Sequence, residues 1–383
     1  MPGEFVFPND AHPAWSIMIV LYPYITGLVA GAFVVSSLYH VFEREALRPV
    51  ARLALVTSLC FCSFATVPLL LHLHHAERCF NVMITPNVNS AIAGFGLIYS
   101  SYMLILIVEV WLVFRPTLVE RANTSPGVAR SLYRVLALGV TTMTPGARAI
   151  DERLVRGLAL LGIPVACVLH GYVGFLFGAV KANPWWSTAL MPVIFLSSAI
   201  VSGIAALILL YLIGCWKKGE SPNVDCVRAL VQYLWVFLIA AVTLEGLEVL
   251  QMAYEREGEW HILAELLTRR LAVSYGLIQV LLGSVIPLLL LPTVFFIRSS
   301  RWLTFVATAG SVLVLVQVLA MRWNVVVGGQ LFSKSFRGFV EFPVHWLGRE
   351  GLLAAAVVMA LPLITLWIAS RILPLSPSEE SVG

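Results

Sequence analysis

Charge is scarce in this 383-residue sequence: Asp, Glu, Lys and Arg make up 12% of it, whereas hydrophobic residues make up 59%. Soluble globular proteins carry about 25% charged residues. The composition therefore excludes a soluble globular protein and predicts a polytopic membrane protein. The net charge of +4 is no sign of nucleic-acid binding, because the basic residues stand between apolar runs, where they set the membrane topology.

Clustered cysteines are also lacking. The six cysteines include no C-x-x-C spacing, which is the usual arrangement for zinc sites and many clusters. The sequence therefore predicts that the cysteines are small buried hydrophobic residues and that the chain holds no iron–sulfur cluster.

The N-terminal region has no Lys or Arg among residues 1–15, and the apolar run that follows is too long for the core of a signal peptide. We expect this run to stay in the protein as the first membrane helix, without cleavage.

Long apolar runs dominate the rest of the chain, and about nine of them reach the roughly 20 residues that a transmembrane helix needs. Helices are expected because backbone groups in lipid must be hydrogen-bonded within the segment. The sequence predicts an all-α polytopic helical bundle with eight to ten spans in one membrane domain, 1–383. The runs are approximately 16–42, 50–75, 91–114, 154–179, 186–214, 228–253, 271–297, 301–322 and 350–373.

The basic residues predict the orientation of this bundle. Assigning the loops alternately to the two sides places 16 of the 25 Lys and Arg on one side. Cytoplasmic loops carry the excess of basic residues. We therefore expect an outer N-terminal segment (1–15), a membrane bundle (16–373) and a cytoplasmic tail (374–383).

Two outer loops have unusual compositions. Residues 254–270 mix glutamates with Trp and Leu, as in a helix lying in the membrane interface. Residues 323–349 are rich in Phe and Trp and suit a re-entrant or surface-packed segment. Together they are a candidate docking surface for an extrinsic protein. The alternative is that their aromatic side chains anchor the chain at the lipid headgroups.

Polar groups collect in the outer half of the spans. They include His72, His170, Arg322 and Asn324, and Glu245 and Glu248, which share one helical face because they are three residues apart. Ionisable groups within spans mark a ligand or a pathway, although each could also be a helix–helix hydrogen-bond partner.

A quinone headgroup fits such a site, since its carbonyl oxygens need donors and its redox chemistry moves two protons. His72 and His170 are the predicted headgroup hydrogen-bond partners, and Glu245 and Glu248 the predicted proton acceptors or orienting groups. Near the inner face, Glu109 could belong to a proton path, but a side chain reaching the cytoplasmic surface is the favoured interpretation.

Particular stretches of the sequence are similar to a known family. L-H-L-H-H-A-E-R-C-F-N-V-M-I-T-P-N-V-N-S at 71–90 resembles the outer-loop motif of the NrfD and polysulfide-reductase membrane subunits. H-G-Y-V-G-F-L-F-G-A-V-K-A-N-P-W-W-S-T-A-L-M-P at 170–192 and R-W-N-V-V-V-G-G-Q at 322–330 look like its longer branch, of the HybB and DsrP type. The resemblance covers roughly 15–373.

This resemblance implies a haem-free, quinone-reactive subunit of a prokaryotic cytoplasmic-membrane complex, built from two four-helix bundles plus extra helices. It implies exchangeable menaquinone or ubiquinone, a ferredoxin-like iron–sulfur subunit docked on the outer face, and a further catalytic or multihaem subunit. Matching motif positions implicate His72, Glu77, Arg78, Asn87, Asn89, His170, Arg322 and Asn324. Arg78 and Arg322 would balance the charge of the acids.

Two other classes of protein stay open. A b-type cytochrome needs paired axial histidines; His72 and His170 could supply one haem, but the inner side offers only His40. A secondary transporter usually has its polar groups at the bilayer midplane on broken helices. The predicted cluster lies further out than that.

Overall fold

The computed structural model describes residues 13–87, 89–255, 260–333, 336 and 338–375. The predicted outer segment up to residue 12 and the predicted tail beyond residue 375 lie outside these ranges. Among the described residues the chain is helical, and the pairing outside helices is one antiparallel bridge between Phe332 and Phe339. Nine helices in this part are long and apolar enough to cross a membrane, which confirms the all-α membrane class.

Each predicted apolar run corresponds to one of these spans. The spans are α1 (Ile17–His40), η1–α2–α3 (Glu45–Leu47, Arg48–Phe64 and Val67–His72), α5 (Ala93–Thr124), α7 (Pro145–Gly178), α8 (Met191–Lys218), α9 (Val224–Glu255), η4–α11–η5 (Ala272–Val285, Ile286–Leu290 and Leu291–Phe295), α12 (Ser300–Val326) and α13 (Leu352–Ile372). The shorter elements between them are η2 (Ala76–Arg78), α4 (Asn81–Ile84), α6 (Gly127–Leu136), α10 (Trp260–Glu265), η3 (Leu266–Arg270) and η6 (Gly328–Gln330).

The third and fourth spans are longer than predicted. The predicted runs 91–114 and 154–179 correspond to α5, which ends at residue 124, and α7, which begins at residue 145. The apolar run stops at Arg115, but the helix does not, because Arg115 on α5 pairs with Asp151 on α7 at 2.8 Å. The predicted inner loop is therefore mostly helical, and along the chain α6 lies between the end of α5 and the start of α7.

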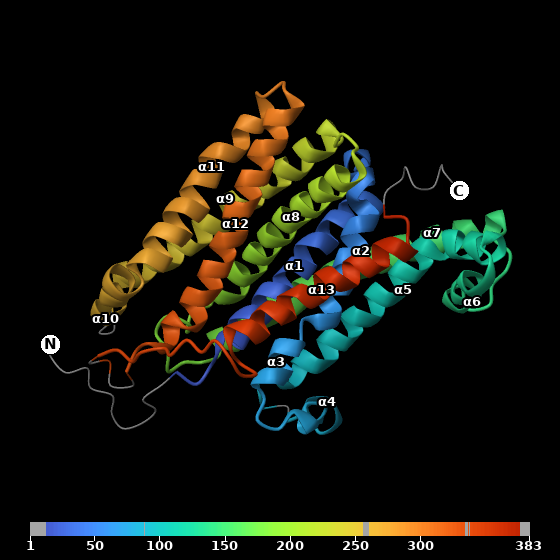
Figure 1. The fold of residues 1–383 in the computed structure, drawn as a ribbon. Helices are drawn as coiled ribbons and strands as arrows, with labels where there is room; N and C mark the ends of the chain where they lie inside the picture. Colours follow the sequence, from blue (N-terminus) through green and yellow to red (C-terminus); the bar gives the residue numbers. More distant parts are fainter. Residues whose placement is uncertain (1–12, 88, 256–259, 334–335, 337, 376–383) are drawn as a thin grey trace.

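The spans form two four-helix groups, as the family resemblance implies. In the first group α1, α2, α5 and α7 pack around one another, and in the second group α8, α9, η4–α11–η5 and α12 do the same. The groups meet where α1 contacts α8 and α12 (Figure 1), and α13 lies outside against α1 and α2. Accordingly, 83% of the most apolar stretch of α1 is buried, compared with 22% of that of α13.

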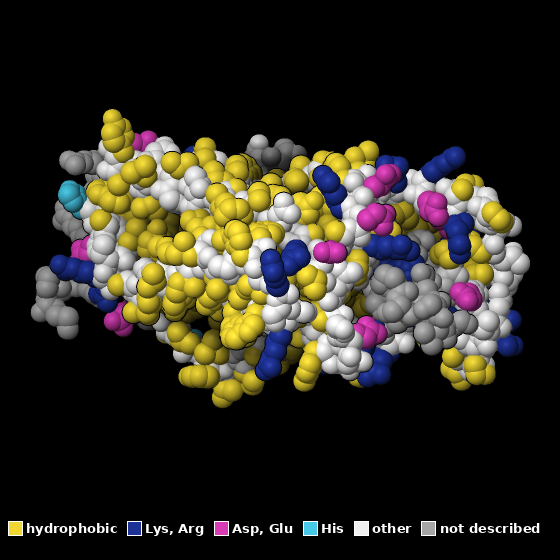
Figure 2. All heavy atoms as spheres, turned by 90° about the horizontal axis from the view of Figure 1, so that it is seen from above, with side chains coloured by type: hydrophobic (Ala, Val, Ile, Leu, Met, Phe, Trp, Pro, Cys, Tyr) yellow, Lys and Arg dark blue, Asp and Glu magenta, His cyan; other side chains and the backbone are white. Residues whose placement is uncertain are grey.

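The two ends of the molecule differ in content. The α4 end holds η2, α4, α10 and the described part of the segment 327–351, and the α6 end holds α6 and the turns 41–44, 219–223 and 296–299 (Figure 1). Hydrophobic side chains spread over the face in Figure 2, where charged side chains gather mostly on the side of α6. Exposed leucines on the spans, such as Leu104 and Leu289, are what a lipid-facing surface requires.

The predicted outer loops differ in structure. In 254–270, α10 and η3 are helical and bury Ile262 and Leu266 against the protein. In 323–349, α12 continues to Val326 and is followed by η6 and irregular chain, so the described part of this loop does not span.

A glycine pair sets the crossing of the two bundles. A Cβ on Gly203 of α8 would lie 2.5 Å from the Cα of Gly31 on α1. Small residues allow helix backbones to approach this closely in membranes.

Gly203→Ala is therefore expected to destabilise the protein by about 1–3 kcal/mol, as overpacking does. Gly214→Ala is the matched control on α8, because a Cβ there meets nothing within 4 Å. Thermal unfolding in detergent measures the difference. Equal melting temperatures for the two variants would contradict this account of the crossing.

Candidate functional site

A connected set of polar side chains lies inside the second bundle. The Glu245 carboxylate on α9 accepts hydrogen bonds from the Gln279 amide (2.9 Å) and the Gln317 amide (3.2 Å). The Gln279 carbonyl accepts from the Asn324 amide at 2.8 Å, and the Asn324 carbonyl accepts from the Ser274 hydroxyl at 2.7 Å. We call these five residues the Glu245 network; Gln279, Gln317 and Asn324 are buried.

The Glu245 network depends on how η4 packs against α12. A Cβ on Gly283 of η4 would lie 2.2 Å from the Cβ of Gln317, so only glycine lets α12 come this near. Residues 272–285 form a π-helix, which is rare over more than one turn and is frequent at functional sites. Within it, Gln279 reaches Glu245 on α9 and Asn324 on α12, and Ser274 reaches Asn324.

Arg322 lies beside this network but faces α8. Its guanidinium donates to the Ser198 hydroxyl at 2.7 Å and to the Phe195 carbonyl at 3.1 Å, and it lies 3.8 Å from the centroid of the Phe195 ring. The side chain is 1% exposed. Its electrostatic partner is Glu245, so the two charges stabilise each other inside the bundle.

Glu248 is the second acid of the site, three residues after Glu245 on the same face of α9. It is 6% exposed, and one carboxylate oxygen has no hydrogen-bond partner among the described residues. Glu248 and Tyr275 both interact electrostatically with Glu245. A buried acceptor without a donor is uncommon, so Glu248 has hydrogen-bonding capacity left for a ligand.

His170 joins the two sides of the first bundle. Its Nδ1 lies 2.7 Å from the Ala166 carbonyl, and its Nε2 contacts the Thr26 carbonyl on α1. Both neighbours are carbonyl oxygens, and a neutral imidazole has one N–H, so the ring donates to one of them at a time. A hydrogen bond from His170 to a ligand would require one of these contacts to break.

His72 lies at the α4 end with a different partner. Its Nδ1 is 3.1 Å from a carboxylate oxygen of Glu350 and 3.4 Å from the hydroxyl of Ser16, which caps α1. A small cavity of about 80 Å³, lined by Ser16, Trp323 and Glu350 among others, adjoins this group. His72 is thus a polar contact beside a cavity, in a group separate from the Glu245 network.

Burial raises the pKa of Glu350, but hydrogen bonds from Ser16 and His72 and the nearby charges of His72 and Arg349 outweigh this effect, so the pKa is lowered. Because the folded-state pKa lies below the ordinary value, the ionised carboxylate stabilises the fold at neutral pH. This stabilisation is lost only as the pH falls through the lowered pKa.

The remaining predicted residues are exposed in the loop between α3 and α5. Glu77 contacts His75 at 3.0 Å, the Asn87 side chain accepts from the Asn89 backbone at 3.1 Å, and Arg78 is exposed as well. In this part of the chain α3 packs on α1 and α13, and α4 packs on α5. The structure therefore brings Glu245, Glu248, Arg322 and Asn324 together but leaves this loop with the first bundle.

The prediction that the Glu109 side chain reaches the cytoplasmic surface is wrong. Glu109 is 0% exposed, and neither carboxylate oxygen has a hydrogen-bond partner among the described residues. The nearest arginine along α5, Arg115, pairs with Asp151 instead.

The described residues contain no group of three or more His, Cys, Asp or Glu that could hold a metal ion.

Comparison with known proteins agrees with this architecture. The family model described as polysulphide reductase, NrfD, matches residues 7–334. The chain belongs to the NrfD family. All ten candidate residues of the sequence prediction lie within the matched part, and the family assignment together with the nine spans makes the chain a multi-pass integral membrane protein.

NrfD-family relatives come from bacteria and archaea. The chain is 30% identical to a selenate reductase subunit of Mesobacillus selenatarsenatis, over 61% of this chain and 56% of that protein. It is 25% identical to the protein NrfD of Escherichia coli, over 83% of this chain and 95% of that protein. It is 23% identical to the Hdr-like menaquinol oxidoreductase integral membrane subunit of Archaeoglobus fulgidus, over 92% and 79% respectively. The aligned part spans little more than half of the selenate reductase protein.

Proposed function

We propose that this chain is the quinone-reactive membrane anchor of a prokaryotic respiratory complex. It exchanges electrons between menaquinone or ubiquinone in the membrane and a ferredoxin-like iron–sulfur subunit, which connects to a catalytic or multihaem subunit. The family supports a membrane subunit, and one relative is named as part of a menaquinol oxidoreductase. The single observation that carries the proposal is the pair of acids inside the second bundle, Glu245 and Glu248, beside buried Arg322.

This arrangement suits the proton chemistry of a quinol. Oxidation of a quinol releases two protons with two electrons, so acceptors must lie beside its hydroxyl groups. Gln279 and Gln317 hold Glu245 in place, whereas Glu248 keeps an unpartnered oxygen that can take a proton. Arg322 offsets the negative charge of the ionised acids. The chain itself offers no redox group in this proposal, so the electrons pass to the partner subunit.

The partner is proposed to dock at the α4 end, on the described parts of 254–270 and 323–349. Trp346 and Leu347 are 75% and 76% exposed there. Large apolar side chains beyond the ends of the spans are typical of a protein-contact surface. They would place the iron–sulfur subunit on the same end as the quinone site.

Quinol-dependent electron transfer tests the proposal as a whole. The purified complex is expected to oxidise menaquinol or ubiquinol while reducing its iron–sulfur subunit, and to show no haem absorbance assigned to this chain. A b-type haem would show its absorbance bands in the isolated subunit. A folded complex in which quinol fails to reduce the iron–sulfur subunit would overturn the quinone assignment.

The orientation is proposed from the 16 basic residues on the α6 side. Asn87 at the α4 end is exposed, and Val128 on α6 is 87% exposed. In a background with native cysteines replaced, Asn87→Cys is expected to react with an impermeant thiol reagent in intact cells. Val128→Cys should react only after permeabilisation. The reverse pattern would place the proposed quinone site on the cytoplasmic side.

A further inference from the structure

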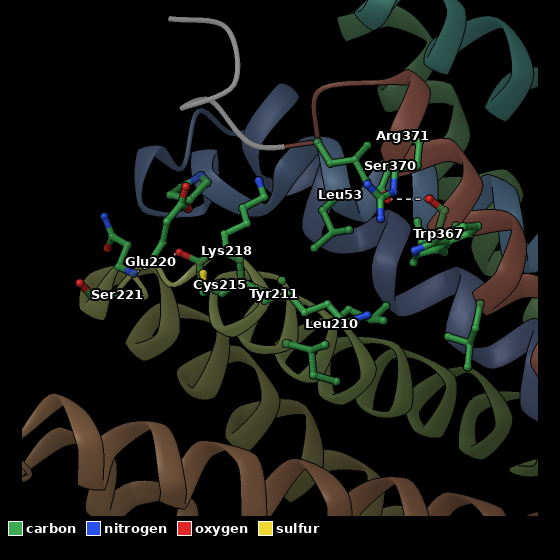
Figure 3. A pocket seen from close by; sticks show the side chains of 18 residues that line it. Leu53, Leu210, Tyr211, Cys215, Lys218, Glu220, Ser221, Trp367, Ser370 and Arg371 are labelled. Atoms are coloured by element: carbon green, nitrogen blue, oxygen red, sulfur yellow. Dashed lines mark hydrogen bonds between the residues drawn. The ribbon is translucent and has the colours of Figure 1, made fainter. Parts of the chain in front are cut away.

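A groove of about 860 Å³ lies at the α6 end, far along the spans from the Glu245 network. It opens between the C-terminal ends of α8 and α13, over the N-terminal half of α2 (Figure 3). Its walls are mostly apolar, with Leu53 from α2, Leu210 from α8 and Leu366 from α13. This volume is in the range of pockets that bind whole small molecules.

The rim of the groove is cationic. Lys217 and Lys218 stand in the last turn of α8, and Arg371 stands in the last turn of α13. Among the described residues that line the groove, Glu220 is the one acid, so three cations and one carboxylate give these residues a charge of +2. In Figure 3 Lys218 and Arg371 lie on either side of Leu53, so positive charge faces the groove from two helices.

The groove also lies at the right depth for a lipid headgroup. The cations occupy the ends of two membrane spans, where the apolar core gives way to the headgroup layer. Trp367 is 54% exposed in the lining, and the Arg371 guanidinium lies 5.3 Å from the centroid of its ring. Trp side chains are enriched at this level of the bilayer.

We propose that this groove is a binding site for an anionic phospholipid. Lys217, Lys218 and Arg371 hold the phosphate, and the acyl chains lie along the leucine walls towards the exposed side of Ile213. Basic pockets between transmembrane helices bind anionic headgroups in this way. A quinone fits less well, because its headgroup is uncharged and offers no counter-charge to the basic rim of the groove.

Native mass spectrometry of the full-length purified chain tests the site. One molecule of phosphatidylglycerol is expected to stay bound about tenfold more tightly, or better, than phosphatidylcholine with the same acyl chains. Inorganic phosphate at the same concentration should not displace it. Equal binding of the two lipids, or displacement by phosphate alone, would overturn the proposal.

Two pairs of variants locate the binding. Replacing Lys217, Lys218 and Arg371 by Gln is expected to weaken phosphatidylglycerol binding by about 10²-fold. The matched control replaces Arg153, Arg298 and Arg301 by Gln. These residues are exposed at the same end but lie outside the groove, so the control should bind phosphatidylglycerol normally. If the control loses as much affinity, the charge of the surface rather than the groove holds the lipid, and the proposal fails.

Gly214→Phe fills the groove without touching a charge, because a Cβ on Gly214 meets nothing within 4 Å. Gly157→Phe is the control, on an equally open glycine of α7 outside the groove. We expect Gly214→Phe to lose about tenfold or more in phosphatidylglycerol affinity and Gly157→Phe to lose none. Normal binding by a folded Gly214→Phe protein would show that the lipid lies elsewhere.

Discussion

Glu248→Gln is expected to lower the rate of quinol oxidation by about 10²-fold or more, the lower end of general acid–base contributions. The substitution keeps the shape of the side chain and removes the group that accepts a proton. One carboxylate oxygen of Glu248 has no hydrogen-bond partner in the described part of the chain, whereas both oxygens of Glu245 accept bonds from amides. Of the two acids, Glu248 is therefore the one that can take a proton without first breaking a hydrogen bond.

The measurement is steady-state quinol oxidation by the assembled complex between pH 6 and 8, under conditions where quinone chemistry limits the rate. Glu120→Gln is the control, since Glu120 is exposed on α5 and lies outside both the Glu245 network and the two loops proposed to bind the partner. It should keep full activity. Unchanged turnover in an assembled Glu248→Gln complex would remove Glu248 from the mechanism.

The spans could be predicted because the sequence pattern that marks each of them is local. A run of about 20 apolar residues can only be a helix in lipid, so each of the nine runs led to one span. The ends were harder to predict, since the tertiary ion pair between Arg115 and Asp151, 36 residues apart, extends α5 and α7 beyond their apolar runs. The two-bundle arrangement came from the family resemblance, because helix order alone does not say which helices touch.

The candidate site could be predicted only in part. The spacing of Glu245 and Glu248 was visible on one helix, and Arg322 and Asn324 were predicted both from their place in the outer half of a span and from the family motif. Ser274 and Gln279 were missed because a period of 3.6 residues does not describe a π-helix. A lone Gln within the apolar run A-V-S-Y-G-L-I-Q-V-L-L-G was the available signal.

Contacts between distant residues also escaped prediction. His72 and Glu350 are 278 residues apart, and His170 reaches the Thr26 carbonyl 144 residues away. No periodicity within one helix encodes such pairs. The polar groups predicted to collect in the outer half of the spans therefore form separate groups, including one around Glu245 and one around His72.

Arg322→Met is expected to destabilise the protein by about 3 kcal/mol, the lower end for leaving a charge uncompensated inside a protein. The lower end applies because Glu245 is only half-buried, although Arg322 itself is 1% exposed. Methionine replaces most of the apolar length of arginine, and Ser198 still donates to the Phe195 carbonyl at 3.1 Å. The main loss is therefore the positive charge that offsets Glu245.

A second substitution separates this cause from a general packing defect. In the double variant Arg322→Met, Glu245→Gln no uncompensated charge is left, and a glutamine at position 245 still hydrogen-bonds with Gln279 and Gln317. We expect the double variant to regain most of the melting temperature lost by Arg322→Met, as measured by thermal unfolding in detergent. Arg301→Met, at the exposed start of α12, is the control and should unfold like the wild type. If the double variant is no more stable than Arg322→Met alone, the two residues contribute to stability independently, and Arg322 is held in the bundle by Ser198 and Phe195 instead of by the charge of Glu245.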